Sequence, residues 1–173
     1  MKKIISLLCV LLVAVSLTAC GGGKTPEEVG EYWEHCVHNG ELELFYKEHC
    51  SDLFFTLNVA PHIDKEEFYA RAEKGSDDNL ADDQKANRKY VFKSSRVVKD
   101  YAAQEVKDYN KVYELRIPDY KENFKDLAIV EVRYEIYVND VFEKEEIKNL
   151  LLGKLNGEWK FNRFMPWDPV LNQ

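Results

Sequence analysis

The sequence predicts an α+β fold in which N-terminal helices pack on one face of a curved antiparallel sheet. Between residues 26 and 74, apolar residues recur at helical spacing. From residue 90 onward they alternate with polar residues, which is the period of a strand. Asn156-Gly157 lies between two apolar segments and is typical of a two-residue hairpin turn. Helices followed by hairpin-connected strands favour an antiparallel meander over a parallel α/β sheet.

The first expected helix begins at Pro26. Thr25 can cap it, Pro26 suits the first helical position, and Glu28 completes a capping box. Asn39-Gly40 is expected to end it. Its apolar face comprises Val29, Tyr32, Trp33, Cys36 and Val37.

Two further helices are expected before the sheet. The second covers about 41–49, and the apolar segment 51–57 predicts a turn that continues the helical region. Asp64 is a suitable cap for a third helix over 65–74. The polar, acidic segment 75–89 is interpreted as a loop, with one helical turn as the alternative.

The second half of the chain is expected to form strands. The clearest is 127–138, where valine, tyrosine and isoleucine alternate with charged residues. Its apolar face is expected to comprise Val130, Val132, Tyr134, Ile136 and Val138. The other expected strands cover 90–99, 101–107, 111–117, 142–155 and 159–165.

The N-terminus has the pattern of a secretory signal. Met1-Lys2-Lys3 is basic, and 4–17 is almost wholly apolar. A membrane-spanning helix needs about 20 apolar residues, so this segment is too short to span. We therefore expect export rather than a transmembrane anchor.

The end of this segment, Leu17-Thr18-Ala19-Cys20, resembles the bacterial lipoprotein lipobox. The resemblance implies cleavage after Ala19, diacylglyceryl transfer to the Cys20 thiol and acylation of the new amino group, for example by palmitate. The alternative is an ordinary signal peptide whose cysteine is incidental. The expected organisation is a signal peptide over 1–19, a lipidated cysteine with a glycine-rich tether over 20–24, and one domain over 25–173.

The negative charge of the chain argues against nucleic acid and anionic lipid as partners. The chain has 24 basic and 31 acidic residues, a net charge of −7, and loss of Lys2 and Lys3 with the leader makes it more negative. Such a domain is a poor binder of nucleic acid and would be repelled by anionic lipid. Attachment to the membrane is therefore expected through the lipid on Cys20 alone, on the extracytoplasmic face of a bacterial cell membrane.

Over residues 25–165 the mature chain resembles the nuclear transport factor 2-like superfamily, and within it small bacterial lipoproteins. The features are the Thr-Pro-Glu-Glu-Val start at 25–29, the long late strands and the Leu-Asn-Gly-Glu-Trp-Lys-Phe hairpin at 155–161. The resemblance implies a cone of helices and bent sheet; a cystatin-like or other helix-on-sheet fold is the alternative. Aromatic residues expected at its mouth or floor, or else in a filled core, are Trp33, Phe45, Tyr113, Tyr134, Trp159 and Phe161.

Cys36 and Cys50 remain after the leader and Cys20 are accounted for. A helical hairpin could join them in a disulfide, which persists outside the cytoplasm. The alternatives are two buried free thiols, or a metal site with the neighbouring histidines, although zinc-type spacing is absent. His35 and His38 are expected to face solvent, and the acidic segment 77–83 is expected to be a solvated loop rather than a calcium site.

These observations lead to a non-enzymatic, membrane-anchored module that binds a small apolar ligand or an envelope protein. Catalytic members of the resembled superfamily place Asp or His beside tyrosines in the cone, but no inward position of 127–138 carries Asp, Glu or His. No catalytic residue, metal or cofactor is therefore assigned. The alternatives are a small enzyme of the isomerase or dehydratase type and a structural envelope protein.

Overall fold

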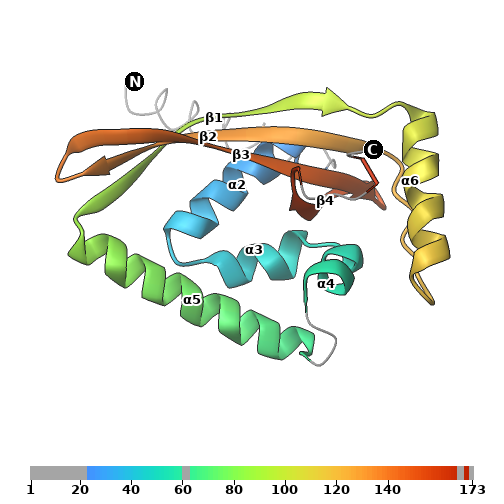
Figure 1. Ribbon diagram of the computed structural model, residues 1–173, viewed down its shortest axis with the longest axis horizontal. Helices are drawn as coiled ribbons and strands as arrows, with labels where there is room; N and C mark the ends of the chain where they lie inside the picture. Colours follow the sequence, from blue (N-terminus) through green and yellow to red (C-terminus); the bar gives the residue numbers. More distant parts are fainter. Residues whose placement is uncertain (1–22, 60–62, 167–169, 172–173) are drawn as a thin grey trace, which may run out of the picture.

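The computed structural model describes residues 23–59, 63–166 and 170–171. The signal peptide, the cleavage site after Ala19 and the lipidated Cys20 lie outside these residues, so those expectations stay predictions. The elements are α2 Pro26–His38, α3 Leu42–His49, α4 Asp52–Asn58, α5 Lys65–Lys85, β1 Arg88–Asp100, α6 Ala103–Arg116, β2 Leu127–Val138, β3 Val141–Leu155 and β4 Glu158–Phe164 (Figure 1).

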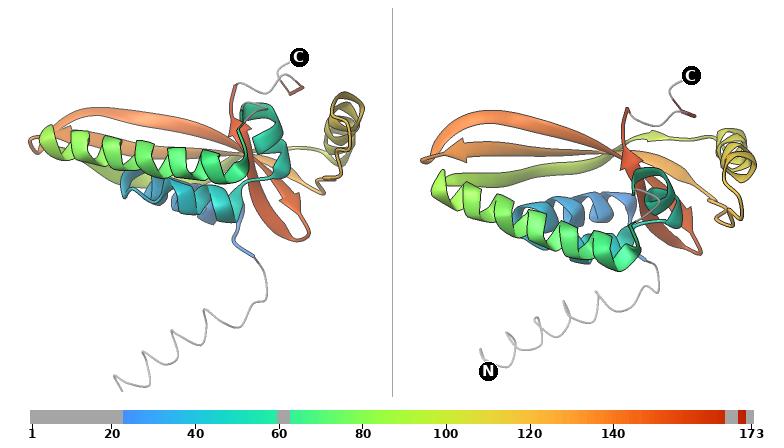
Figure 2. Two further views of the ribbon diagram at one scale, coloured as in Figure 1. Left: turned by 90° about the horizontal axis from the view of Figure 1, so that it is seen from below. Right: turned by 60° about the horizontal axis from the view of Figure 1, so that its bottom comes forward.

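The predicted α+β class is confirmed. In the described part of the chain, five helices accompany a four-stranded antiparallel sheet of order β1-β2-β3-β4. The sheet is a long ribbon that is not strongly curled, and it does not form the expected cone (Figure 2). The helices α2, α3 and α5 lie along one side of this ribbon, whereas α6 lies at its end away from the β2–β3 hairpin (Figure 1).

The first helix forms as its sequence predicts. Thr25 Oγ1 accepts a hydrogen bond from the Glu28 backbone N–H at 3.3 Å, and Glu28 Oε2 accepts one from the Thr25 N–H at 2.7 Å. Two N-terminal donors of the helix are thus satisfied. Val29, Trp33 and Cys36 are buried, so the predicted apolar face of α2 covers the sheet.

Two hydrophobic clusters hold the fold together. The larger lies between the helices and the sheet, where the expected inward face of β2 is confirmed and Val138 is half-buried at its end. The smaller lies on the α6 side and also receives Leu53 from α4. Burial of apolar surface stabilises a fold by about 25 cal/mol per Å². These clusters are therefore the main favourable contribution to the free energy of folding. The smaller cluster comprises Leu53, Tyr101, Val106, Tyr109, Tyr113, Phe124, Leu127 and Leu151.

Two predicted strands are wrong. The segments 101–107 and 111–117 contain one helix, α6, instead. The buried residues are Val106, Tyr109 and Tyr113, which are spaced by three and four, whereas Leu115 is 76% exposed. The alternation of Tyr113, Leu115 and Ile117 is therefore incidental, and the helical period decides the structure.

The predicted loop at 75–89 is also wrong, because α5 continues to Lys85 and β1 begins at Arg88. Gly75 has open space around it and helical neighbours, and an interior glycine costs a helix only about 1 kcal/mol. Ser76 is buried, and Asp83 accepts hydrogen bonds from β1. These tertiary contacts stabilise a segment whose own sequence reads as polar and irregular.

Both predicted hairpin turns are confirmed. Asn139 and Asp140 have φ of 51° and 61°, and Asn156 and Gly157 have φ of 51° and 90°. Positive φ at both central residues is the geometry of the twisted two-residue hairpin, which Asn, Asp and Gly tolerate best. The turns fix the register of β3 against both of its neighbours.

Strand β3 is much longer than β4. β4 pairs only with the section of β3 from Leu150 to Leu155, while β2 pairs with β3 from Val141 to Gly153. Among the described residues, no strand therefore pairs with the other edge of 141–149. This section is called the open β3 edge below.

Candidate functional site

A cavity of about 490 Å³ lies where β4 ends and the open β3 edge begins. α2 and α4 contribute to it from the helix side, and β3, β4 and the residue after β4 complete it. We call it the β3-edge cavity. Its lining residues are Trp33, Asn58, Ile147, Lys148, Asn149, Arg163, Phe164 and Met165.

The sheet register places residues from both faces of the sheet at this cavity. Phe164 pairs with Leu150 and Arg163 with Leu151. Opposed residues of an antiparallel pair share a face, and successive residues alternate. Phe164 therefore lies on the helix-covered face, where its ring packs edge-on against Trp33 at 5.5 Å between centroids, and Arg163 lies on the other face. The cavity thus continues around the edge of the sheet.

Three buried polar atoms in the cavity wall have no hydrogen-bond partner among the described residues. They are Trp33 Nε1, Asn149 Oδ1 and Arg163 Nε. Trp33 is only 4% exposed. Buried polar groups are nearly always hydrogen-bonded, because an unpaired one costs about 1–3 kcal/mol. The two unpaired donors and one unpaired acceptor in this wall are groups that a bound polar molecule would satisfy.

The cavity is locally basic in an acidic chain. Lys148 Nζ lies 3.3 Å from Glu146 Oε2, so one cation is partly neutralised. Within the described ranges no carboxylate forms an ion pair with Arg163. An unneutralised guanidinium at a partly buried position favours an anionic group opposite it. The apolar side chains of Ile147, Phe164 and Met165 surround these charges.

A second polar group lies deeper between α2 and the sheet. His38 Nδ1 is 3.0 Å from Glu34 Oε1, and the two side chains are only 11% and 10% exposed. The His38 ring stacks on Tyr90 with centroids 3.7 Å apart and meets Tyr134 edge-on at 4.8 Å. The expectation that His38 faces solvent is therefore wrong, because the end of α2 packs on the sheet.

The tyrosines connect this pair to charged residues at its margin. Tyr134 donates a hydrogen bond to Glu146 at 2.7 Å, and Lys144 Nζ lies 2.6 Å from the same carboxylate. The bonds from Lys144 and Tyr134 lower the pKa of the Glu146 carboxyl to about 2. Glu146 also contacts Lys148, so it links this group to the β3-edge cavity.

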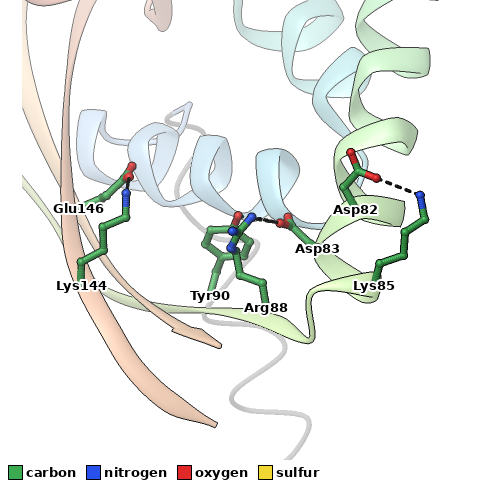
Figure 3. A network of polar contacts seen from close by, with 7 residues as sticks. All are labelled: Asp82, Asp83, Lys85, Arg88, Tyr90, Lys144 and Glu146. Carbon is green, nitrogen blue, oxygen red and sulfur yellow. Dashed lines mark hydrogen bonds and ion pairs between the residues drawn. The ribbon is translucent and has the colours of Figure 1, made fainter. Parts of the chain in front are cut away.

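Figure 3 shows charged residues of α5, β1 and β3 together with Tyr90. Lys144 and Glu146 lie on β3, while Arg88 reaches Asp83 of α5 beside Tyr90. The Tyr90 hydroxyl donates to Asp83 at 3.1 Å, and the Arg88–Asp83 pair is 2.8 Å long. The contacts fasten the end of α5 to β1. Among the described residues, Glu34, His38, Tyr90 and Tyr134 line neither the β3-edge cavity nor the other cavities reported in this section.

Another cavity, of about 540 Å³, lies between α4 and the loop 117–123. The Glu122 carboxylate in its wall accepts hydrogen bonds from the backbone N–H groups of Asp52 and Leu53, at 2.8 and 2.7 Å. Burial raises the pKa of Glu122, and the two N–H groups oppose that rise. These bonds already satisfy the carboxylate, so we interpret Glu122 as a clamp between loop and helix.

The six aromatic residues expected to line one pocket lie at different places in the structure. Trp33 lines the β3-edge cavity, and Trp159 lines a smaller one beside Gly23 and His49. Phe45, Phe161 and Tyr134 are buried in the larger cluster. Tyr113 is buried in the smaller cluster, so the six do not surround one space.

Cys36 and Cys50 are free thiols in this structure, and the expected disulfide is not formed. Both belong to the larger cluster, Cys36 fully and Cys50 partly buried. Burial raises the pKa of both thiols, which favours the protonated, unreactive form. The structure therefore comes nearest to the first alternative, with two free thiols of which Cys36 is buried and Cys50 is half-buried.

The residues considered for metal binding lie apart. His35 is on the exposed side of α2, where its side chain is 57% exposed, whereas His49 packs between Tyr32 and Phe45. The acidic segment 77–83 belongs to α5 and is not a loop. In the part of the chain that the structure describes, no group of three or more metal-binding side chains comes together.

No helix within 23–59, 63–166 and 170–171 combines the length and the apolar composition needed to cross a bilayer. Comparison of the chain with protein-family models, curated proteins and solved structures found no significant match. The assignment of a function therefore rests on the residues themselves.

Proposed function

We propose that this protein is a lipid-anchored, extracytoplasmic binding module of a bacterial envelope and not an enzyme. The lipobox-like Leu17-Thr18-Ala19-Cys20 supports the anchor. The β3-edge cavity supports the binding, because it combines an apolar wall, a guanidinium with no acidic partner in the described residues and a buried, unpaired indole N–H. That cavity is the single observation on which the binding function depends. We also propose a likeness to the nuclear transport factor 2-like superfamily, which is supported by the helices that precede the antiparallel sheet. The sheet differs from the cone of that superfamily because it is not strongly curled.

The tether determines which end of the domain faces the membrane in this proposal. A Cβ built on Gly23 would lie 3.5 Å from Glu158 Cγ and 3.6 Å from the Gly157 carbonyl oxygen, so the domain begins beside the β3–β4 turn. Cys20 is three residues from Gly23, and such a segment spans at most about 11 Å. A lipid on Cys20 would therefore hold the β3–β4 turn near the bilayer. The β2–β3 turn, at the other end of β3, would point away from it.

A small enzyme is the second candidate, and one observation favours it. The buried Glu34–His38 pair lies against Tyr90 and Tyr134, which is the combination that acid–base chemistry uses. Catalysis also needs a cavity in which a substrate can contact these groups. The cavities described above are lined by other residues. The pair is better explained as a satisfied polar contact at the end of α2.

Native mass spectrometry of protein isolated from its own cells tests the binding function. We expect a bound molecule that is lost in Arg163→Gln and kept in Arg96→Gln, since Arg96 lies on β1 and does not line the cavity. Binding that is equal in the two variants would contradict the site. The binding function would be contradicted if the isolated protein carried no bound molecule and if no small molecule added to it bound at the cavity.

A further inference from the structure

We infer that the β3-edge cavity binds the C-terminal end of a peptide whose last residue is apolar. This inference rests on the proposed binding function and specifies its ligand. Its three supports are two cationic side chains that line the cavity, a strand edge without a partner strand in the described chain, and apolar lining residues.

The cations specify a carboxylate. Arg163 and Lys148 both line the cavity, and only Lys148 has an acidic neighbour among the described residues. A guanidinium binds a carboxylate through parallel N–H bonds, and such charge-assisted bonds are about twice as strong as neutral ones. The unpaired Trp33 Nε1 adds a third donor to the same cavity. A terminal carboxylate would satisfy donors that the described protein leaves unpaired.

The strand edge specifies a peptide. The Asn149 carbonyl accepts a hydrogen bond from the Met165 N–H at 2.8 Å, so Asn149 directs its backbone toward the β4 side. Backbone groups of a strand point alternately to its two edges, so Ile147 directs its N–H and C=O to the same side. On that side β4 has ended, and in the described chain Ile147 pairs only across its other edge, with Arg133 of β2. An extended peptide can add to such an edge through main-chain hydrogen bonds.

The remaining wall specifies an apolar last residue. Trp33, Phe164 and Met165 provide an apolar surface beside the cations, and Asn149 Oδ1 is an acceptor without a donor. A C-terminal residue carries its own N–H next to its carboxylate, which matches an acceptor next to donors. Because the three unpaired atoms are buried, binding requires small rotations of the side chains at the rim.

The test compares matched probes on the full mature domain. The first probe is an acetylated tripeptide of two alanines and a C-terminal leucine, the second is the same peptide with an amidated C-terminus, and the third is acetyl-leucine. Binding is followed through the Trp33 indole N–H signal in proton–nitrogen correlation spectra. We expect the acid to bind about tenfold or more tightly than the amide, because the charge-assisted bonds are lost, and more tightly than acetyl-leucine, because the edge bonds are lost.

Variants locate the effect. Arg163→Gln should abolish the preference for the acid, Arg163→Lys should restore part of it, and the control Arg96→Gln should leave it unchanged. Equal binding of acid and amide would overturn the carboxylate, and equal binding of the tripeptide and acetyl-leucine would overturn the strand-edge contact. If neither peptide binds while the native protein carries another molecule in an Arg163-dependent manner, this inference fails and the proposed function stands.

Discussion

Gly30 of α2 lies directly against Val130 of β2. A Cβ built on Gly30 would be 2.8 Å from Val130 Cγ1, and it would meet the Ser95 hydroxyl of β1 at still closer range. Real Cβ atoms essentially never approach other atoms so closely. The absence of a side chain at this position therefore allows α2 to lie close against the sheet.

Substitution Gly30→Ala should lower the free energy of unfolding by about 1–3 kcal/mol, because the helix must move off the sheet. Gly75→Ala is the matched control: Gly75 is also helical, but a Cβ there has nothing within 4 Å. The control should raise stability by up to about 1 kcal/mol through helix propensity. Urea unfolding of both variants checks this, and equal effects would show that α2 does not pack as described.

Glu146 makes stability depend on acid pH. Its folded pKa is about 2, lowered from an ordinary 4.5, so its ionised form contributes stability that is fully present above about pH 4.5. That contribution is lost as pH falls from about 4.5 to 2. Glu146→Gln should therefore be less stable than the parent at neutral pH, with a difference that shrinks across this window. The exposed Glu143 provides the control Glu143→Gln, and a difference for Glu146→Gln that stays constant with pH would contradict the ion pair.

Both thiols should resist modification in the folded protein. Cys36 and Cys50 are packed in the larger cluster, and burial raises their pKa, so alkylation at neutral pH should be slow. In denaturant without reductant, both should be alkylated rapidly. Mass analysis counts the added groups. Two unreactive cysteines in denaturant that become reactive only after reduction would restore the disulfide that the sequence suggested.

The proposed anchor predicts an orientation. A fluorophore on Glu158→Cys, beside Gly23, should be quenched by spin-labelled lipid head groups more strongly than one on Glu143→Cys. The two sites lie near opposite ends of β3, whose 15 residues extend about 50 Å. Native lipidated protein in vesicles is the sample, and detergent-solubilised protein is the control. Equal quenching of the two labels would contradict an anchor at the β3–β4 turn.

The sequence predicted well where one signal dominated. The capping box at Thr25 and the alternation over 127–138 each have a direct physical cause, and both elements have their expected extents. Prediction failed where two periods competed. The segment 101–117 contains both an alternating and a helical pattern of apolar residues, and the packing of Tyr109 against Tyr113 and Phe124 selects the helix.

The candidate site was mostly not predictable. Trp33 was expected to line a pocket, but Arg163, Lys148 and Asn149 looked like ordinary polar residues of strands. Their significance depends on β4 ending at Phe164, which leaves the adjoining section of β3 without a strand on that side in the described chain, and strand ends are weakly encoded. The signal available in the sequence was a basic residue, Arg163, between the aromatic residues Phe161 and Phe164 of the last strand. The burial of His38 likewise depends on a long-range contact with Tyr90.

The anchor is tested most directly by the intact mass of the protein taken from its own cells. The proposal predicts a polypeptide that begins at Cys20, with the mass of a diacylglyceryl group and, where present, an amide-linked acyl chain on that residue. Cys20→Ser should appear without lipid and should no longer sediment with membranes. A chain recovered with residues 1–19 attached and no added lipid would contradict the account.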